Sequence, residues 1–228
     1  MDLDVHVRLT RTANDDLGGF LAEEHLAIVL LANVLQDLYQ TDSRMHFDNC
    51  AFSAGADYVH DEWSLIEASA ESSEPTALGA CGRLLHAVQD FYSHSNWVEL
   101  HLDVDPIPVW DLAGSSLPSD VVSGTWVLGR PKNCRPGTPS HSELNKDDAH
   151  SDSGREIVGA GPHQGKTLFD LASDVAVRAS VQQLGRLRDV KVHFLTEGPI
   201  AQQLWAHDLT AEALVGLAAE SSRFKGSL

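Results

Sequence analysis

The chain has 228 residues, 43% of them hydrophobic and 21% charged, which is enough to bury a sizeable core. Its formal net charge of −17 argues against a surface that binds nucleic-acid phosphates. Three scattered cysteines are too few for a disulfide framework or a thiolate zinc site, and Cys81 is predicted to be plain core. The N-terminus lacks a Sec-type signal, so we expect a soluble chain that is cytoplasmic or exported by a non-classical route, with membranes as a candidate place of action.

Hydrophobic periodicity predicts five helices, after a polar lead-in at residues 1–14 that is expected to be loose. Their approximate spans are residues 15–39, 54–70, 76–100, 164–187 and 200–221. Between residues 101 and 161, prolines and glycines cluster and the helical period is lost, apart from a short strand predicted near residues 121–128. We therefore expect an all-α fold: one helical-bundle domain over residues 1–228, with its core at 15–190, an irregular insertion at 101–161 and a C-terminal helix at 200–221.

So long an insertion is abnormal in a compact domain unless it is functional or partly structured. Its second half is rich in polar side chains, which we interpret as a lid or rim that contributes to a site. These residues are Ser140, His141, Asn145, Lys146, Asp147, Asp148, His150 and Asp152.

The segment around which the rest is organised is the predicted helix that carries His86, Asp90 and His94. Their i, i+4, i+8 spacing places all three on one helix face, among leucines, Val88 and Phe91 that are expected to be buried. Burying an imidazole or carboxylate group without a hydrogen-bond or ionic partner costs roughly several kcal/mol, so each of these groups needs a partner. A metal ion would satisfy all three at once. The ordinary alternative is a core histidine hydrogen-bonded to a helix carboxylate.

Four further side chains are candidate ligands: His25, Asp37, His46 and His163. Zinc takes histidine nitrogen and aspartate oxygen, and a catalytic site keeps one position for water. Each candidate has an ordinary alternative, respectively a core histidine, a surface charge at a helix end, a loop cap and a helix N-cap. Other acidic and histidine residues are assigned to the site's surroundings or to the surface: Asp48, Asp57, His60, His193 and His207.

The segments Asn33–Asp37, His46–Phe52 and Leu84–Glu99 (LLHAVQDFYSHSNWVE) resemble the HET-C family, which comprises the fungal heterokaryon-incompatibility protein and bacterial HET-C-like toxins. More distantly, the pattern is similar to zinc-dependent phospholipase C and the related zinc nucleases. This resemblance implies an all-helical protein with one to three zinc ions. It also implies that Asp37 is catalytic, bridging metals or taking a proton. The metal ligands it implies are His25, Asp37, His46, His86, Asp90, His94 and His163.

The sequence departs from the zinc enzymes in three ways that bear on hydrolysis more than on metal binding. The gap from Asp90 to His94 is shorter than their usual spacing. Nothing here replaces their N-terminal tryptophan ligand. Thr167 stands where their last ligand pair has glutamate, and Asp170 is the nearest carboxylate. One metal site is therefore expected to be altered or missing.

Two functions follow as expectations. The first is a HET-C-like cytotoxic or cell-death effector that acts on membranes, with a histidine–aspartate metal site. The alternative is a zinc-dependent phosphodiesterase that cleaves phospholipid head groups. The candidate partners are membrane phospholipid, a second copy of the chain in a homo-oligomer, and an immunity or other partner protein. The acidic surface offers no polybasic anchor, which weakens direct binding to anionic bilayers.

Overall fold

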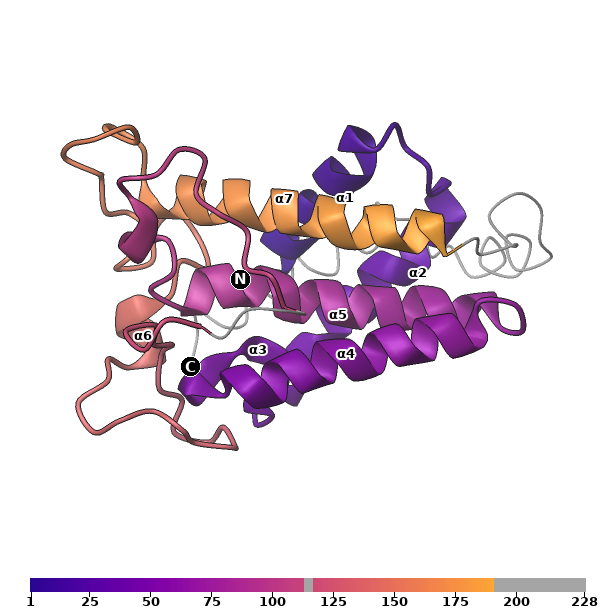
Figure 1. Ribbon diagram of the computed structural model, residues 1–228, viewed down its shortest axis with the longest axis horizontal. Helices are drawn as coiled ribbons and strands as arrows, with labels where there is room; N and C mark the ends of the chain where they lie inside the picture. The colour runs from indigo at the N-terminus through magenta and orange to yellow at the C-terminus, as the bar shows by residue number, and fades with distance from the viewer. Residues whose placement is uncertain (113–116, 191–228) are drawn as a thin grey trace. The chain divides into compact units, whose positions relative to one another are not determined.

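The computed structural model describes residues 1–112 and 117–190 (Figure 1). Over these residues the chain is all-α, as predicted, and extended segments meet only in isolated β-bridges. The helices are α1 (Leu3–Asp16), α2 (Glu23–Val34), α3 (Ser43–His46), α4 (Phe52–Ser69), α5 (Glu74–His94), α6 (His141–Leu144) and α7 (Leu168–Asp189). Three 3₁₀ helices, η1 (Leu35–Tyr39), η2 (Asp48–Cys50) and η3 (Glu99–His101), lie between them. Among the described residues, no helix is long and apolar enough to cross a membrane.

The chain divides into two compact units. Among the described residues, unit 1 comprises Met1, Tyr39–Val59 and Ala87–Ala179, and unit 2 comprises Asp2–Leu38, His60–His86 and residues 180–190. Helices α4, α5 and α7 contribute residues to both units. A single domain over residues 1–228 stays a prediction, and the predicted C-terminal helix at 200–221, with His193 and His207, lies outside the described residues.

Unit 2 begins with a helix where the sequence predicted a loose lead-in. Val5, Leu9 and Ala13 of α1 are buried at helical spacing, and Asn14 closes the helix by bonding the backbone N–H and C=O of Leu21 at 3.0 and 3.2 Å. The chain then turns through two glycines with positive φ before α2 starts. The predicted helix at 15–39 is therefore wrong in extent, because it joined the end of α1, this turn, α2 and η1.

Within unit 2, α2 and α5 approach so closely that Gly82 has no room for a side chain. A Cβ there would lie 2.2 Å from the carbonyl oxygen of Val29 and 2.8 Å from Cβ of Ala32. Gly82 lies one turn before His86 on α5, so the same close packing fixes the position of that histidine.

We expect Gly82→Ala to lower the free energy of unfolding by about 1–3 kcal/mol, because the methyl group would force α2 and α5 apart. Gly79→Ala on the same helix is the matched control. Its Cβ would meet only the Arg83 guanidinium, at 3.6 Å, so helix propensity should leave it neutral or more stable by up to about 1 kcal/mol. Urea unfolding of both variants measures the difference. Equal stabilities would show that α2 and α5 can separate without cost.

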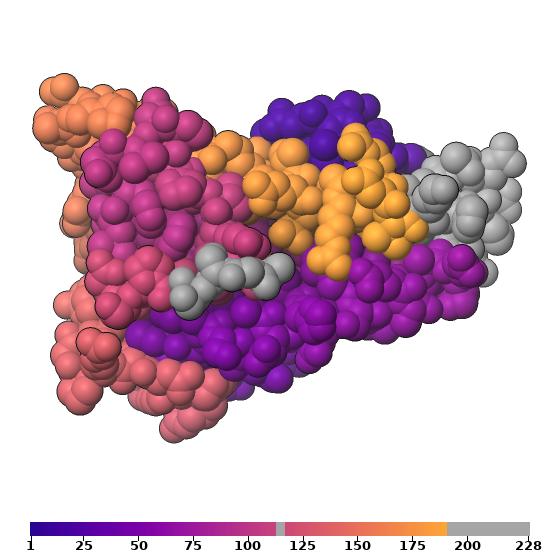
Figure 2. Space-filling view, in the orientation of Figure 1, coloured from indigo at the N-terminus to yellow at the C-terminus, as the bar shows by residue number. Residues whose placement is uncertain are grey.

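In unit 1 the insertion is irregular, as predicted, and it forms a large part of the visible surface around α6 (Figure 2). The strand predicted at 121–128 reduces to single bridges at Ser123 and Thr125. The cysteines form no framework of disulfides among the described residues, but the sequence did not predict the single disulfide that joins Cys50 and Cys134. Cys81 is free and buried, as predicted. The disulfide joins η2 to the middle of the insertion.

Two helix ends differ from prediction for identifiable reasons. Helix α5 ends at His94, where the backbone turns toward Val122 and Gly124. Helix α7 begins at Leu168 because Thr167 and Asp170 bond reciprocally: Asp170 N–H donates to Thr167 Oγ1 at 3.1 Å, and Thr167 N–H donates to the Asp170 carboxylate at 3.3 Å. Asp170 thus serves as a capping residue.

Candidate metal centre

The C-terminal end of α5 carries two of the predicted ligands into unit 1. Asp90 and His94 are one turn apart, and both are almost completely buried. His46, at the end of α3, meets Asp90 through Nδ1, 2.9 Å from Oδ2. The Met1 amino group contacts Asp90 Oδ1 and lies 3.4 Å from His94 Nε2. The α5 face therefore holds its imidazole and carboxylate groups against polar partners, as the helical spacing predicted.

A second carboxylate and a second imidazole surround His94 from the loops. Asp48 Oδ1 lies 3.4 Å from His94 Nδ1 and 3.0 Å from His141 Nδ1. The two imidazole rings are edge to face with centroids 4.4 Å apart. One ligand atom from each of Asp48, His94 and His141 falls within 4.8 Å of the others, which makes them a group that could hold a metal ion.

Asp147 closes the opposite side of the same two imidazoles. Its Oδ1 lies 2.9 Å from His94 Nε2 and 3.0 Å from the Met1 amino group, and its Oδ2 lies 3.4 Å from His141 Nε2. Ser93 Oγ donates to the same Oδ1 at 2.7 Å. The imidazole pair is thus flanked by Asp48 on the Nδ1 atoms and by Asp147 on the Nε2 atoms.

Lys146 fixes the loop that delivers Asp147. Its side chain is completely buried, and Nζ donates to the carbonyls of Ser95 and Leu144, each at 3.0 Å, and to the Glu99 carboxylate at 2.9 Å. Its backbone N–H donates to the Ser93 carbonyl at 3.1 Å. The loop is therefore anchored to the end of α5 on both sides of residue 146, and Asp147 has little freedom to leave His94.

Gly124 joins the ligand-bearing segments at one point. Its N–H donates to the carbonyl of His94, and its carbonyl accepts from Asn49 N–H, both at 2.9 Å. A Cβ at this position would lie 2.5 Å from Cα of His141. Only glycine allows the three segments that carry His94, Asp48 and His141 to meet so closely.

Electrostatics couple these groups strongly. Burial raises the pKa of the Asp48 carboxyl, but His94 and His141 outweigh it and hold that pKa well below its usual range. Burial lowers the pKa of His94, yet Asp90, Asp48 and Asp147 raise it well above its ordinary value. Burial and the charge of His94 lower the pKa of His141, while hydrogen bonds to Asp147 and Asp48 raise it to about 9. These pKa shifts favour the imidazolium form of His94 and His141 opposite the ionised carboxylate of Asp48.

The pKa of Asp147 is set by the same two opposing effects, burial and nearby charge. Burial raises the pKa of its carboxyl, but the Met1 ammonium and the charge of His94 outweigh burial and hold that pKa well below its usual range. The lowered pKa values favour the ionised form of Asp48 and Asp147, which can accept a cation.

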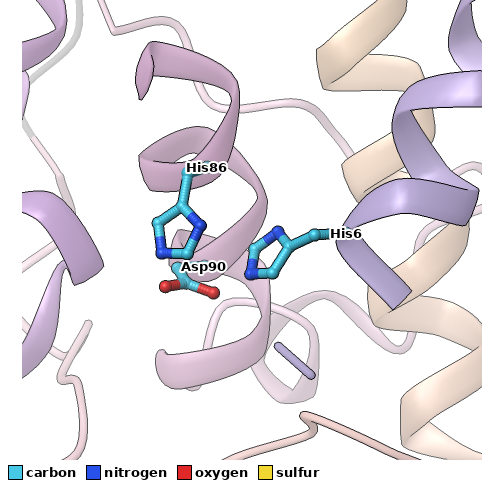
Figure 3. A group of neighbouring side chains, drawn as sticks. All are labelled: His6, His86 and Asp90. Carbon is cyan, nitrogen blue, oxygen red and sulfur yellow. The ribbon is translucent and has the colours of Figure 1, made fainter. Parts of the chain in front are cut away.

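Unit 2 holds the preceding turn of the same α5 face. The rings of His86 and His6 stack with centroids 4.2 Å apart, and Asp90 follows His86 by one turn of α5 (Figure 3). His86 Nδ1 lies 3.4 Å from Asn33 Oδ1, and a carboxylate oxygen of Asp37 lies within 4.8 Å of a ring nitrogen of His86. His86 and Asp37 are therefore neighbours, as the ligand prediction required, and His6 joins them.

Two of the predicted ligands do not join the centre. His25 pairs through Nε2 with Glu74, which begins α5 about 18 Å along the helix from His86. His163 is buried but lies with Nε2 2.8 Å from the carbonyl oxygen of Val104. In both cases Nε2 has an ordinary partner away from the other predicted ligands, so the structure does not bring His25 or His163 to this centre. Asp57 and His60 are exposed, as expected.

Three residues of these clusters were underestimated from the sequence and one was missed. Asp48 was assigned to the surroundings, and His141 and Asp147 were predicted only as part of a lid or rim. His6 was missed because Leu3, Val5, Val7 and Leu9 alternate like a strand and hide the helical spacing. The detectable signal was the helical register of Val5, Leu9 and Ala13, with His6 and Thr10 on the adjoining positions.

Comparison with known proteins points to one family. Residues 19–116 match the family described as VWA7 N-terminal domain. The chain is 40% identical to human von Willebrand factor A domain-containing protein 7 over 79 residues, which are 33% of this chain and 9% of the human protein. It is 30% identical to the rat protein of the same name over 199 residues, 72% of this chain and 22% of that protein. The chain spans about a fifth or less of the length of these relatives. No solved structure matches it.

The resemblance to the HET-C family is thereby corrected. The VWA7 match covers residues 19–116, which include the Leu84–Glu99 segment on which that resemblance chiefly rested. The segment encodes a buried helix with a polar face and an aromatic cluster, a physical requirement that does not identify one family. The toxin, programmed-cell-death and heterokaryon-incompatibility roles, and the immunity partner, depended on the resemblance and are withdrawn.

Proposed function

We propose that unit 1 is a metal-binding domain whose histidine–aspartate centre takes zinc, and that the reaction it supports is phosphodiester hydrolysis. The observation that carries the proposal is the convergence of Asp48, His94 and His141, with one ligand atom each within 4.8 Å of the others. Nitrogen and carboxylate oxygen are the ligands that zinc takes, at about 2.0–2.2 Å. Two ligands at tetrahedral angles are then about 3.4 Å apart, close to the 3.0 and 3.4 Å found here.

The second carboxylate supports the same assignment. A metal-binding imidazole usually donates its other N–H to a carboxylate or a backbone carbonyl, which fixes the ring and its tautomer. Here Asp48 and Asp147 lie on opposite nitrogens of both imidazoles, so one carboxylate can bind the metal while the other orients the rings. His94 Nδ1 faces both Asp48 Oδ1, at 3.4 Å, and the carbonyl oxygen of His46, at 2.9 Å.

When bound, zinc supplies a Lewis acid for a phosphoryl oxygen and lowers the pKa of a bound water. The chain's own residues would hold the centre in place. Ser93 and Lys146 position Asp147, and Gly124 brings His141 against His94. Asp147 or Asp48, whichever does not bind the metal, is placed to accept a proton.

The disulfide also bears on the compartment in which the protein acts. The Cys50–Cys134 disulfide supports an oxidising compartment rather than the cytoplasm, because disulfides persist mainly in secreted and extracellular proteins. We therefore favour export among the two locations expected from the sequence.

Elemental analysis of protein purified without chelator tests the centre. We expect about one or more zinc ions per chain in the unmodified protein and in the exposed control His60→Ala. In His94→Ala and in the milder His141→Gln, zinc affinity should fall by more than about a hundredfold, because a ligand is removed. Circular dichroism establishes that the variants are folded. Full zinc content in both site variants would overturn the metal centre and leave a metal-free ion-pair network.

The reaction is tested separately on zinc-loaded protein. A chromogenic phosphodiester such as bis(p-nitrophenyl) phosphate should be cleaved by the unmodified protein and by His60→Ala, and not by His94→Ala. Zinc that binds without any cleavage of this ester or of phosphatidylcholine would overturn hydrolysis and leave the metal-binding role.

A further inference from the structure

The insertion in unit 1 exposes two adjacent aliphatic side chains. Val127 and Leu128 are 78% and 64% exposed, at a bend between the bridge at Thr125 and the bridge at Arg130. Most large apolar side chains of the described residues are buried, and scattered single exceptions need no explanation. Val127 and Leu128 differ from such single exceptions because they are adjacent in the sequence and both are largely exposed. We call residues 126–132 the tip.

The charge of this region is opposite to that of the chain. From residue 121 to residue 142 there is no aspartate or glutamate, although the whole chain carries −17. The same stretch contains three exposed cations, Arg130, Lys132 and Arg135. Lys132 Nζ donates to the carbonyl of Val127 at 2.8 Å, and Arg130 Nη1 donates to it at 3.2 Å. Two positive groups are therefore held at the backbone carbonyl of Val127, within the segment that exposes the two aliphatic residues.

Hydrogen bonds, close packing and a disulfide hold the tip in one conformation. Asn49 bonds both sides of Trp126, with Nδ2 donating to its carbonyl at 3.1 Å and Oδ1 accepting from its N–H at 3.0 Å. Gly129 packs so tightly that a Cβ would lie 2.5 Å from Asn49 Nδ2. The Cys50–Cys134 disulfide fixes the chain just after the tip. The aliphatic pair is thus presented in a defined conformation, which reduces the entropy lost on binding.

We infer that the tip is a docking surface for an anionic phospholipid membrane. Val127 and Leu128 enter the boundary between head groups and acyl chains, and Lys132 and Arg130 meet the lipid phosphates. Cations beside an anionic leaflet contribute favourably within a Debye length, so the local charge outweighs the more distant acidic surface. The sequence expectation that no anchor exists considered only the net charge. The inference stands whether or not the metal centre hydrolyses a substrate.

Sedimentation with vesicles tests the inference on the full chain. We expect the protein to bind phosphatidylcholine vesicles that contain phosphatidylserine, and to bind pure phosphatidylcholine vesicles more weakly. Added salt should weaken the binding, because the charges involved are exposed. The double variant Val127→Ser with Leu128→Ser should lower partitioning by about tenfold or more, and Lys132→Gln by severalfold.

Ile157→Ser is the matched control, because Ile157 is another aliphatic residue of the insertion and is 69% exposed. It should bind vesicles as the unmodified protein does. Zinc content should be unchanged in all these variants, which separates a failure of docking from a failure of the metal centre. Equal vesicle binding by the double variant would overturn the role of the tip. Failure of the unmodified protein to bind either vesicle would overturn the lipid assignment and favour an acidic protein surface as the occupant.

Discussion

Replacing Lys146 by methionine is expected to lower the free energy of unfolding by about 3–5 kcal/mol, because the change leaves a carboxylate and two carbonyls without their shared cation. Lys146 is completely buried, and its Nζ satisfies Ser95, Leu144 and Glu99 together. Methionine preserves most of the volume and removes the charge. Because Glu99 is 27% exposed and can turn toward water, the lower end of the range is expected.

The control is Lys166→Met. Lys166 is 49% exposed and its ion pair with Asp174 is long, at 3.7 Å, so the loss should stay within about 0.5 kcal/mol. A further variant, Lys146→Met with Glu99→Leu, should recover part of the loss by removing the unpaired carboxylate, while the carbonyls of Ser95 and Leu144 remain unsatisfied. Urea unfolding measures all three. A loss in Lys146→Met no larger than in Lys166→Met would contradict the buried role.

Lys146→Met should also lower the affinity of the protein for zinc. Lys146 anchors the loop that holds Asp147 2.9 Å from His94 Nε2, and a displacement of this carboxylate removes either a ligand or the group that orients the ring. We expect zinc affinity to fall by about 10–100-fold in the folded fraction, which equilibrium dialysis can measure. Unchanged affinity would place Asp147 outside the centre.

The sequence predicts the part of the centre that lies on one helix. Asp90 and His94 lie one turn apart on a single face of α5, and helical spacing alone sets their common direction. The remaining partners depend on contacts between distant segments. His141 reaches His94 only because Gly124 admits its backbone and Lys146 holds the following loop, and neither constraint appears in a local pattern.

His25 is a residue that the sequence assigned to the centre and the structure places elsewhere. Its position on the buried face of α2 was predicted correctly, since it is only 7% exposed. Helical spacing, however, fixes a direction and not a partner. The register between α2 and α5 brings His25 to Glu74 at the first turn of α5, far from the polar stripe. That register depends on the Gly82 contact, which involves residues of both helices.

Removing the Cys50–Cys134 disulfide is expected to lower the free energy of unfolding by about 2–5 kcal/mol, since it closes a loop of 84 residues. Replacing both cysteines by serine keeps the side chains small and polar. Cys81→Ala is the control, because it leaves the disulfide intact and removes only one buried thiol. Unfolding curves that coincide for the serine variant and the control would show that the crosslink contributes nothing.

The disulfide should matter to the metal centre as well as to stability. Phe47, Asn49 and Cys50 all have positive φ, between 53° and 57°, a backbone conformation that costs about 1–3 kcal/mol for residues other than glycine. These residues flank Asp48. The strained backbone is held by hydrogen bonds from Cys50 N–H to Ser123 Oγ and from Cys134 N–H to the Asn49 carbonyl, and by the crosslink itself. Without the crosslink, relaxation of this segment would carry Asp48 away from His94 and His141.

Zinc affinity is therefore expected to fall about tenfold or more on reduction with a phosphine, which avoids the zinc chelation of dithiol reductants, and to the same extent in the double serine variant. Cys81 provides an internal check on the thiol count. Burial raises the pKa of its thiol to about 12, so it should not react with a thiol reagent near neutral pH until the chain unfolds. The folded oxidised protein should then show no reactive thiol, and the reduced, unfolded protein should show three. If zinc affinity were the same before and after reduction, Asp48 would be positioned by the hydrogen bonds of the Ser123–Gly124 segment alone.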